Sequence, residues 1–106
     1  MNSYQLQSMA TREPIKGFVG RFVHSDNMTM AFWNIRAGSA AATHQHPHEQ
    51  VFCLLEGEFE LTVDEKSAVY APGAVVVIPP SVPHSARAIT NSRVLDIFHP
   101  VREDLR

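Results

Sequence analysis

The stretch Gly38–Gly57, with the sequence GSAAATHQHPHEQVFCLLEG, is the most informative part of this chain for both fold and function. It has three histidines within five residues, followed by an apolar run that a glycine ends. Alternate side chains of an extended strand point to one face. One face would therefore hold His44, His46, His48 and Gln50. The proline inside the stretch can shift this alternation, so the pattern predicts that at least two of the four face inward without deciding which.

Imidazole nitrogens and side-chain oxygens gathered on one rigid face are typical ligands of a transition metal. Glu49 is a further oxygen donor in the same stretch, and His84 adds an imidazole after a proline-rich turn. The alternative is a polar loop whose histidines are solvated. We favour a metal site, because a solvated loop rarely has three histidines within five residues that a further histidine joins.

Length and composition favour one small domain that acts on a small molecule. The 106 residues, 44% of them hydrophobic, suffice for one domain over residues 1–106 with its core at about 17–100. The net charge is −2 and no basic run occurs, so nucleic acid is not an expected partner. Neither a signal peptide nor an apolar membrane span is evident, so we expect a soluble, cytoplasmic protein with no membrane partner. Cys53, the single cysteine, is interpreted as a small buried hydrophobic residue.

Short apolar segments separated by turn residues predict an all-β fold. The expected strands are Gly17–His24, Met28–Arg36, Gln50–Leu55, Glu58–Val63, Ala74–Ile78 and Arg93–Phe98. No window shows a sustained helical period, so helices are expected only as short pieces in Met1–Ala10 and after Pro100. Many short strands at regular spacing indicate an antiparallel sandwich or barrel.

A second informative segment lies near the C-terminus. Asp96 falls within the apolar run Val94–Phe98 and shares a strand face with Phe98. Arg102 follows the bend at Pro100 and could fold back over a pocket. An unpaired buried carboxylate is costly, so Asp96 is either functional or paired with a structural arginine, and the spacing leaves both open.

The central stretch resembles the first motif of the cupins, which are small β-barrels of jelly-roll type. That motif reads G-x5-H-x-H-x3-E-x6-G. Here Gly38, His44, His46 and Gly57 keep every spacing, and Gln50 stands in the place of the glutamate.

A second cupin motif, G-x5-P-x-G-x2-H-x3-N, is similar to the segment that starts at Gly73. Pro79 and His84 match it, whereas Ser81 stands in the glycine place and Ala88 in the asparagine place. The two motifs together imply a single-domain cupin.

The resemblance implies that one divalent transition metal, such as Ni, Zn, Fe, Co or Mn, is bound by His44, His46, Gln50 and His84. A neutral amide in place of a carboxylate leaves more positive charge on the ion, which strengthens it as a Lewis acid. In this alignment His48 and Glu49 are spare, and their roles stay open.

The segment Asp96–Leu105 narrows the resemblance to the small cupins of the pectin-degradation type, called KdgF proteins. These enzymes convert 4,5-unsaturated uronate monosaccharides into linear 5-keto-4-deoxyuronate. The resemblance therefore implies a metal-dependent ring-opening enzyme of isomerase or lyase type. Asp96 would be its acid/base, Phe98 a wall for the sugar and Arg102 the partner of the substrate carboxylate.

Two other functions fit the same motifs. One is a cupin dioxygenase, which would require oxygen, and the other is a non-catalytic module that binds a sugar or metabolite. We also expect a homodimer, which the resemblance implies and which would cover Tyr4, Leu6 and Met9 in the N-terminal segment.

Overall fold

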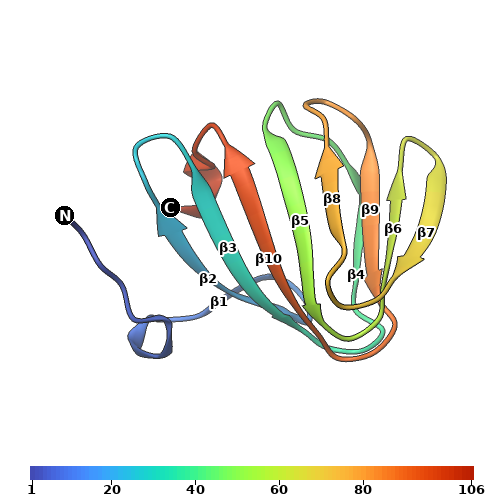
Figure 1. The fold of residues 1–106 in the computed structure, drawn as a ribbon, viewed down its shortest axis with the longest axis horizontal. Coiled ribbons are helices and arrows are strands. Elements are labelled where there is room, and N and C mark those ends of the chain that lie inside the picture. Colours follow the sequence, from blue (N-terminus) through green and yellow to red (C-terminus); the bar gives the residue numbers. More distant parts are fainter.

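Ten strands form two antiparallel sheets that face each other in the computed structural model, which describes all residues 1–106 (Figure 1). The first sheet has the order β1 (Arg12–Ile15), β2 (Phe18–His24), β3 (Thr29–Ile35), β10 (Ser92–His99), β5 (Glu49–Glu56) and β8 (Val75–Ile78). The second has the order β4 (Ala40–His44), β9 (His84–Ala88), β6 (Phe59–Val63) and β7 (Lys66–Tyr70).

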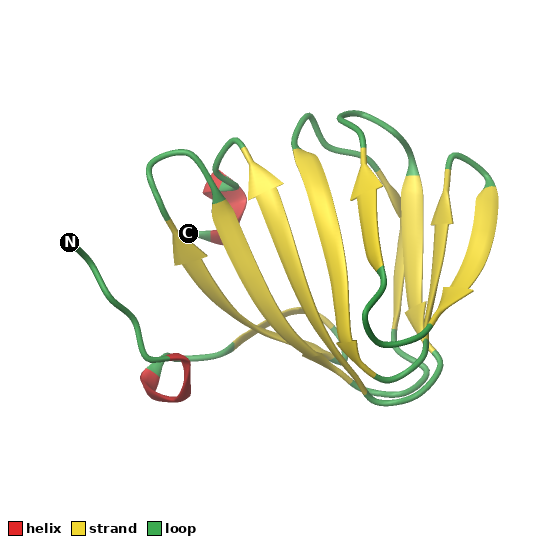
Figure 2. Cartoon of the chain, viewed as in Figure 1, coloured by secondary structure: helices red, strands yellow, loops and turns green.

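Helical structure is confined to two short 3-10 turns, η1 (Leu6–Ser8) and η2 (Glu103–Leu105), as Figure 2 shows. Both lie in the terminal segments where short helices were expected. The predicted all-β fold is therefore confirmed. The structure contains no helix with the length and apolar character needed to span a membrane.

The core lies between the sheets, because each central strand turns alternate side chains inward. Phe52 and Leu54 of β5 are almost fully buried, and so are Phe59 and Leu61 of the facing strand β6. The rings of Phe52 and Phe59 pack across the gap with their centroids 5.2 Å apart. This packing holds the two sheets together at a fixed separation.

Gly57 fixes the turn between β5 and β6. Its φ angle of +94° lies in the left-handed region that favours glycine. A Cβ atom at this position would lie 2.5 Å from the carbonyl oxygen of Asn91 and 2.9 Å from Cα of Ser92. The glycine that ends the first motif is thus required by both backbone conformation and space.

The single strand face considered for His44, His46, His48 and Gln50 is interrupted, as the proline in this stretch allowed. Strand β4 ends at His44, and β5 begins at Glu49, so His46 lies in the segment that connects the two sheets. Pro47 has no amide hydrogen for a ladder, and the chain turns there. The connection lets side chains from both sheets meet at one point.

The other predicted strands are present within one or two residues of their expected ends. Four strands, β1, β4, β7 and β9, were not predicted. The polar hairpin expected at 64–67 joins β6 to β7, with Asp64 and Glu65 at positive φ in its turn.

Candidate metal centre

Three histidines converge where the two sheets meet. A ring nitrogen of each of His44, His46 and His84 lies within 4.8 Å of the ring nitrogens of the other two. His44 at the end of β4 pairs directly with His84 at the start of β9, and their ring centroids are 4.3 Å apart. His46 reaches the same point from the connecting segment, 4.9 Å from the ring of His84.

Each of these rings is held by a hydrogen bond from Nδ1 to a backbone carbonyl. The acceptors are Ala42 for His44 at 2.8 Å, His48 for His46 at 3.0 Å and Val82 for His84 at 2.9 Å. A carbonyl oxygen only accepts, so Nδ1 must donate and Nε2 of the neutral ring keeps its lone pair. Metal-binding histidines are commonly oriented in this way.

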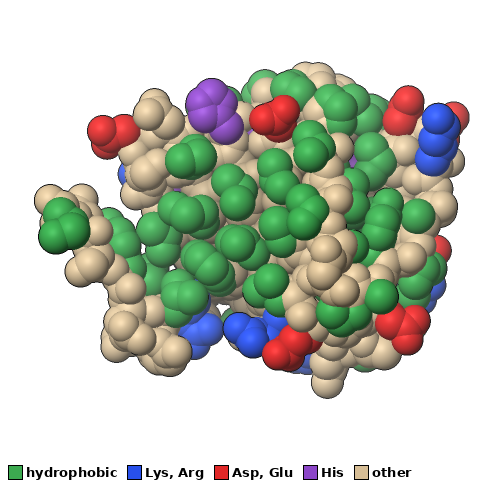
Figure 3. All heavy atoms as spheres, viewed as in Figure 1, with side chains coloured by type: hydrophobic (Ala, Val, Ile, Leu, Met, Phe, Trp, Pro, Cys, Tyr) green, Lys and Arg blue, Asp and Glu red, His purple; other side chains and the backbone are tan.

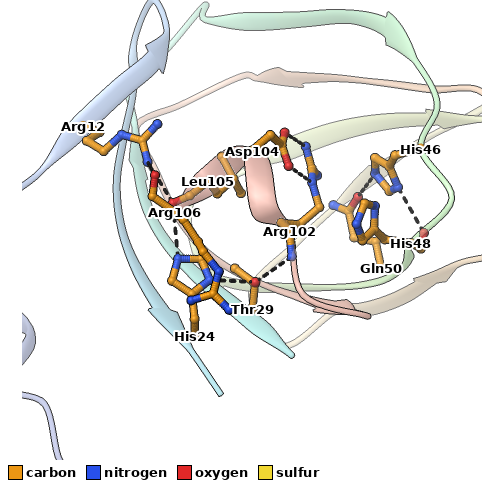
Figure 4. A network of polar contacts seen from close by, with 10 residues as sticks. All are labelled: Arg12, His24, Thr29, His46, His48, Gln50, Arg102, Asp104, Leu105 and Arg106. Carbon is orange, nitrogen blue, oxygen red and sulfur yellow. Dashed lines mark hydrogen bonds and ion pairs between the residues drawn. The ribbon is translucent and has the colours of Figure 1, made fainter. Parts of the chain in front are cut away.

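Gln50 directs an oxygen at this cluster. Its amide nitrogen donates to Oδ1 of Asp96 at 2.9 Å. This leaves Oε1 facing Nε2 of His46 at 3.1 Å (Figure 4). Both of these facing atoms are acceptors when His46 donates from Nδ1. In addition, Nε2 of His84 is buried without any hydrogen-bond partner. A cation would satisfy all of these lone pairs, so the residues fit a metal ion.

The environment also favours the uncharged form of two of these histidines, His46 and His84. Burial lowers the pKa of His46, and the positive charge of Arg102 acts in the same direction. Burial is likewise the main cause of the lowered pKa of His84. Neutral imidazole is the form that coordinates a metal, so both side chains are ready to bind at neutral pH.

Asp96 is buried behind the cluster and accepts two hydrogen bonds. Oδ1 accepts from Gln50, and Oδ2 accepts from the indole nitrogen of Trp33 at 3.1 Å. Burial raises the pKa of Asp96 to about 6, against the opposing effects of these two hydrogen bonds and of Arg102. No arginine forms a salt bridge with Asp96, so the alternative of a structural ion pair is wrong.

Arg102 folds back over Phe98, as its position after the bend allowed. Its guanidinium carbon lies 4.7 Å from the centre of the Phe98 ring. Nε and Nη2 donate to the two carboxylate oxygens of Asp104 at 2.9 and 2.7 Å (Figure 4). The Arg102 side chain is only 16% exposed, so the tail places a held positive charge beside the cluster.

A polar network anchors the tail that holds Arg102 (Figure 4). The backbone amide of Arg102 donates to Oγ1 of Thr29 at 2.9 Å, and Nδ1 of His24 contacts the same hydroxyl. Nε2 of His24 and the guanidinium of Arg12 both reach the carbonyl oxygen of Leu105, whose side chain is buried in the core. These anchors could not be predicted from the sequence, because nothing in local spacing links strands β1 to β3 to the last residues.

The predicted site residues other than His46 line one cavity of about 280 Å³. It is lined by His44, Gln50, His84, Asp96, Phe98 and Arg102, together with apolar core residues. The structure therefore brings the sequence-predicted residues together. His48 lies outside the three-histidine cluster, with its ring centroid 5.5 Å from that of His46, and Glu49 is exposed.

This fold and site define the class of protein. The family model described as "Cupin domain" matches residues 31–98, and the chain belongs to the cupin family. An uncharacterized protein of Streptomyces coelicolor is 28% identical over 102 residues, which cover 94% of this chain and 97% of that protein.

Two solved structures share the whole architecture. KdgF from Halomonas sp. is 24% identical with a TM-score of 0.93, and the match covers 100% of both chains. An RmlC-like cupin from Shewanella frigidimarina is 25% identical with a TM-score of 0.94, covering 100% of this chain and 96% of the other. These likenesses confirm the cupin fold and the resemblance to KdgF proteins.

Proposed function

We propose that this cupin opens 4,5-unsaturated uronate monosaccharides to linear 5-keto-4-deoxyuronate. The observation that supports it is the meeting of two histidines of the cluster, His44 and His84, with Asp96, Phe98 and Arg102 in one cavity. A cluster of imidazoles, a buried carboxyl group and a held guanidinium suit an anionic sugar that must lose and regain a proton. We place this activity in the cytoplasm.

The ligands in this proposal are His44, His46, Gln50 and His84, which would hold one divalent transition metal. When bound there, the ion supplies Lewis acidity for an anionic or enolic oxygen. Gln50 contributes an uncharged oxygen, and its amide cannot rotate freely because Asp96 holds the nitrogen end. Asp96 therefore fixes the orientation of a ligand as well as lying in the cavity.

Asp96 is the proposed acid/base. It removes the proton of the C1 hydroxyl while the C1–O5 bond breaks and C1 becomes a carbonyl. The electrons of that bond leave an enolate at C5, and a proton returned to C4 completes the ketone. Substrate and product are isomers, so no redox partner is needed. The two hydrogen bonds to Asp96 stabilise the carboxylate that starts this sequence.

Arg102 and Phe98 are the proposed binding residues. Asp104 accepts from Nε and from one hydrogen of Nη2, so both hydrogens of Nη1 and the second hydrogen of Nη2 are left for a substrate carboxylate. The ring of Phe98 beneath the guanidinium offers an apolar surface to the sugar. Charge and shape together select a small uronate over a neutral sugar.

The direct test is to incubate the purified protein with the unsaturated monouronate made by a pectate or alginate lyase. Loss of ultraviolet absorbance from the C4–C5 double bond, and NMR of the product, should show ring opening faster than the spontaneous reaction. Arg102→Ala should weaken substrate binding about 10- to 100-fold, because a charge-assisted pair is lost. Arg87→Ala, which removes an exposed arginine of β9, is the matched control and should bind normally.

Two outcomes would reject the proposal. If the substrate opens no faster with the protein than it does spontaneously, a non-catalytic binding module is favoured. A requirement for oxygen would favour a dioxygenase, so the reaction is run with and without oxygen.

A further inference from the structure

The cavity between the sheets has a polar end and an apolar end. The polar end carries the site residues, which are His44, Gln50, His84, Asp96 and Arg102. Most of the other side chains that line the cavity are hydrophobic and come from both sheets, among them Trp33, Ile35, Leu61 and Val94. The proposed function places Phe98 against the sugar and leaves the rest of this apolar lining without a role.

The strands themselves lead from one end of the cavity to the other. On β9, Ala86 follows His84 by two residues and lies on the same face of its sheet. On β10, Val94 precedes Asp96 by two residues, and it pairs with Trp33 of β3. Neighbours on one face of a strand are about 6.7 Å apart. Each sheet therefore changes from polar to apolar over a single step along its strands.

Small side chains keep the apolar end open. Ala41 of β4 pairs with Ala86 of β9, and both line the cavity on the side of the four-stranded sheet. The cavity volume is about 280 Å³. An apolar cavity of about 150 Å³ is large enough to bind benzene. The space between the sheets thus has room for a six-membered ring together with a charged group.

The charges at the polar end favour an acid as the ligand. Arg102 is the cation that lines the cavity, and it retains N–H groups that Asp104 does not use. Both oxygens of Asp96 are turned to Gln50 and Trp33, which donate to them. A carboxylate can therefore pair with Arg102. A mostly apolar cavity with a few convergent polar groups is typical of a small-molecule site.

We propose that this cavity binds a small carboxylic acid with an apolar ring. The carboxylate lies at Arg102, and the ring lies among Trp33, Ala41 and Ala86. A uronate does not suit the apolar end, because its hydroxyl groups would be buried there without partners. This inference goes beyond the proposed function and does not depend on it, since binding of such an acid is measured without any uronate.

The test is isothermal titration calorimetry of the purified protein with phenylacetate, acetate and phenylacetamide. Phenylacetate should bind about 10- to 100-fold more tightly than acetate, because its ring leaves water. Acetate offers the same carboxylate, so the difference measures burial of the ring. Phenylacetamide keeps the ring but has no charge, and it should bind at least about 10-fold more weakly than phenylacetate.

Two substitutions locate the ligand. Ala41→Leu fills the apolar end and should weaken phenylacetate binding at least about 10-fold. Ala40→Leu is the matched control, because the preceding residue of β4 is exposed on the opposite face, and it should bind normally. Arg102→Ala should reduce the affinity for phenylacetate to that for phenylacetamide, whereas Arg87→Ala should not.

Binding in the cavity must be distinguished from binding to the outer side of the six-stranded sheet, where hydrophobic side chains cover much of the surface (Figure 3). Circular dichroism establishes that each variant is folded, and Ala86→Val replaces Ala41→Leu if the latter is not. The inference is wrong if phenylacetate binds no more tightly than acetate. It is also wrong if the folded cavity variant, or Arg102→Ala, binds phenylacetate as tightly as wild type.

Discussion

Asp96 is the residue that links most of the site's contacts. Its two oxygens accept from Gln50 on β5 and from Trp33 on β3, so one carboxylate ties three adjacent strands together. The bond to Gln50 decides which end of that amide faces the histidines. In this hydrogen bond Gln50 donates and Asp96 accepts. This direction can be tested by exchanging the amide and the carboxylate between the two positions.

Reversing the two functional groups should restore the structure but not the chemistry. Asp96→Asn alone leaves one buried donor unpaired and should lower the free energy of unfolding by about 1–3 kcal/mol. Gln50→Glu alone sets two buried carboxylates against each other and should also destabilise the fold. In the double variant, the amide introduced at position 96 can donate to the carboxylate introduced at position 50 and accept from Trp33, so stability should largely return. Urea unfolding of the four proteins measures this coupling.

Turnover separates the two roles of Asp96. The double variant lacks the titrating carboxyl group at position 96, so its rate should stay at least about 100-fold below wild type. If the losses in free energy of unfolding of the two single variants simply add in the double variant, then the direction of the hydrogen bond between Gln50 and Asp96 is misassigned. A double variant with the wild-type rate would show that Asp96 only positions Gln50.

The residues that sequence could not predict are those linked only by tertiary structure. Trp33 is 63 positions from Asp96, and their bond depends on β3 lying beside β10. Thr29, which accepts from the Arg102 amide, is likewise 73 positions away in the sequence. The motif residues were predictable, because their ligand chemistry shows in residue type and spacing alone.

At the scale of elements, strands with strong apolar patterns were predicted and the weaker ones were not. Strand β4 is built of alanine, threonine and histidine, and β7 is almost wholly exposed, so neither has the alternation that marks a half-buried strand. The sequence allowed an interruption at Pro47 but left open which histidines would face inward. His44 and His46 bond through Nδ1 to nearby backbone carbonyls, which a polarity pattern does not reveal.

The C-terminal tail should make a small acid-sensitive contribution to stability. Hydrogen bonds from Arg102 lower the pKa of Asp104 from its ordinary 3.8. A lowered pKa means that the contribution is present above about pH 4 and is lost as pH falls through the folded-state pKa. Because Asp104 is 60% exposed, solvent screening should keep the effect below about 1 kcal/mol.

The measurement is the free energy of unfolding between about pH 2 and pH 7 for wild type and Asp104→Asn. The two curves should separate near neutral pH and converge in acid. Glu103→Gln is the control, since that side chain pairs with Arg106 and not with Arg102. A constant difference across the whole range would contradict the ion pair with Arg102.

For the whole molecule, the two faces of the six-stranded sheet have different roles in this account. The inner face holds the core and the site, and the outer face presents Val75 and Val77 to solvent. Cys53 reports on the outer face, because it pairs across the strands with Leu95 of β10 and Val75 of β8. Burial raises the pKa of Cys53, and the negative charge of Asp96 adds to this effect, so little thiolate is present at neutral pH.

Cys53 should therefore react slowly with iodoacetamide, and faster as the pH rises past the usual range for a thiol. Reaction at neutral pH as fast as that of the urea-unfolded chain would contradict the raised pKa of Cys53.

The proposed chemistry requires that the three-histidine cluster is a metal centre, and this can be tested by measuring the metal content per chain. Elemental analysis after loading with a divalent transition metal and desalting should give about one ion per wild-type chain. His84→Ala should lose nearly all of it, because Nε2 of His84 is a buried ligand without any other partner. His48→Ala, which removes a neighbouring ring outside the cluster, should keep it. Metal that is retained in His84→Ala and lost in His48→Ala would contradict the central claim.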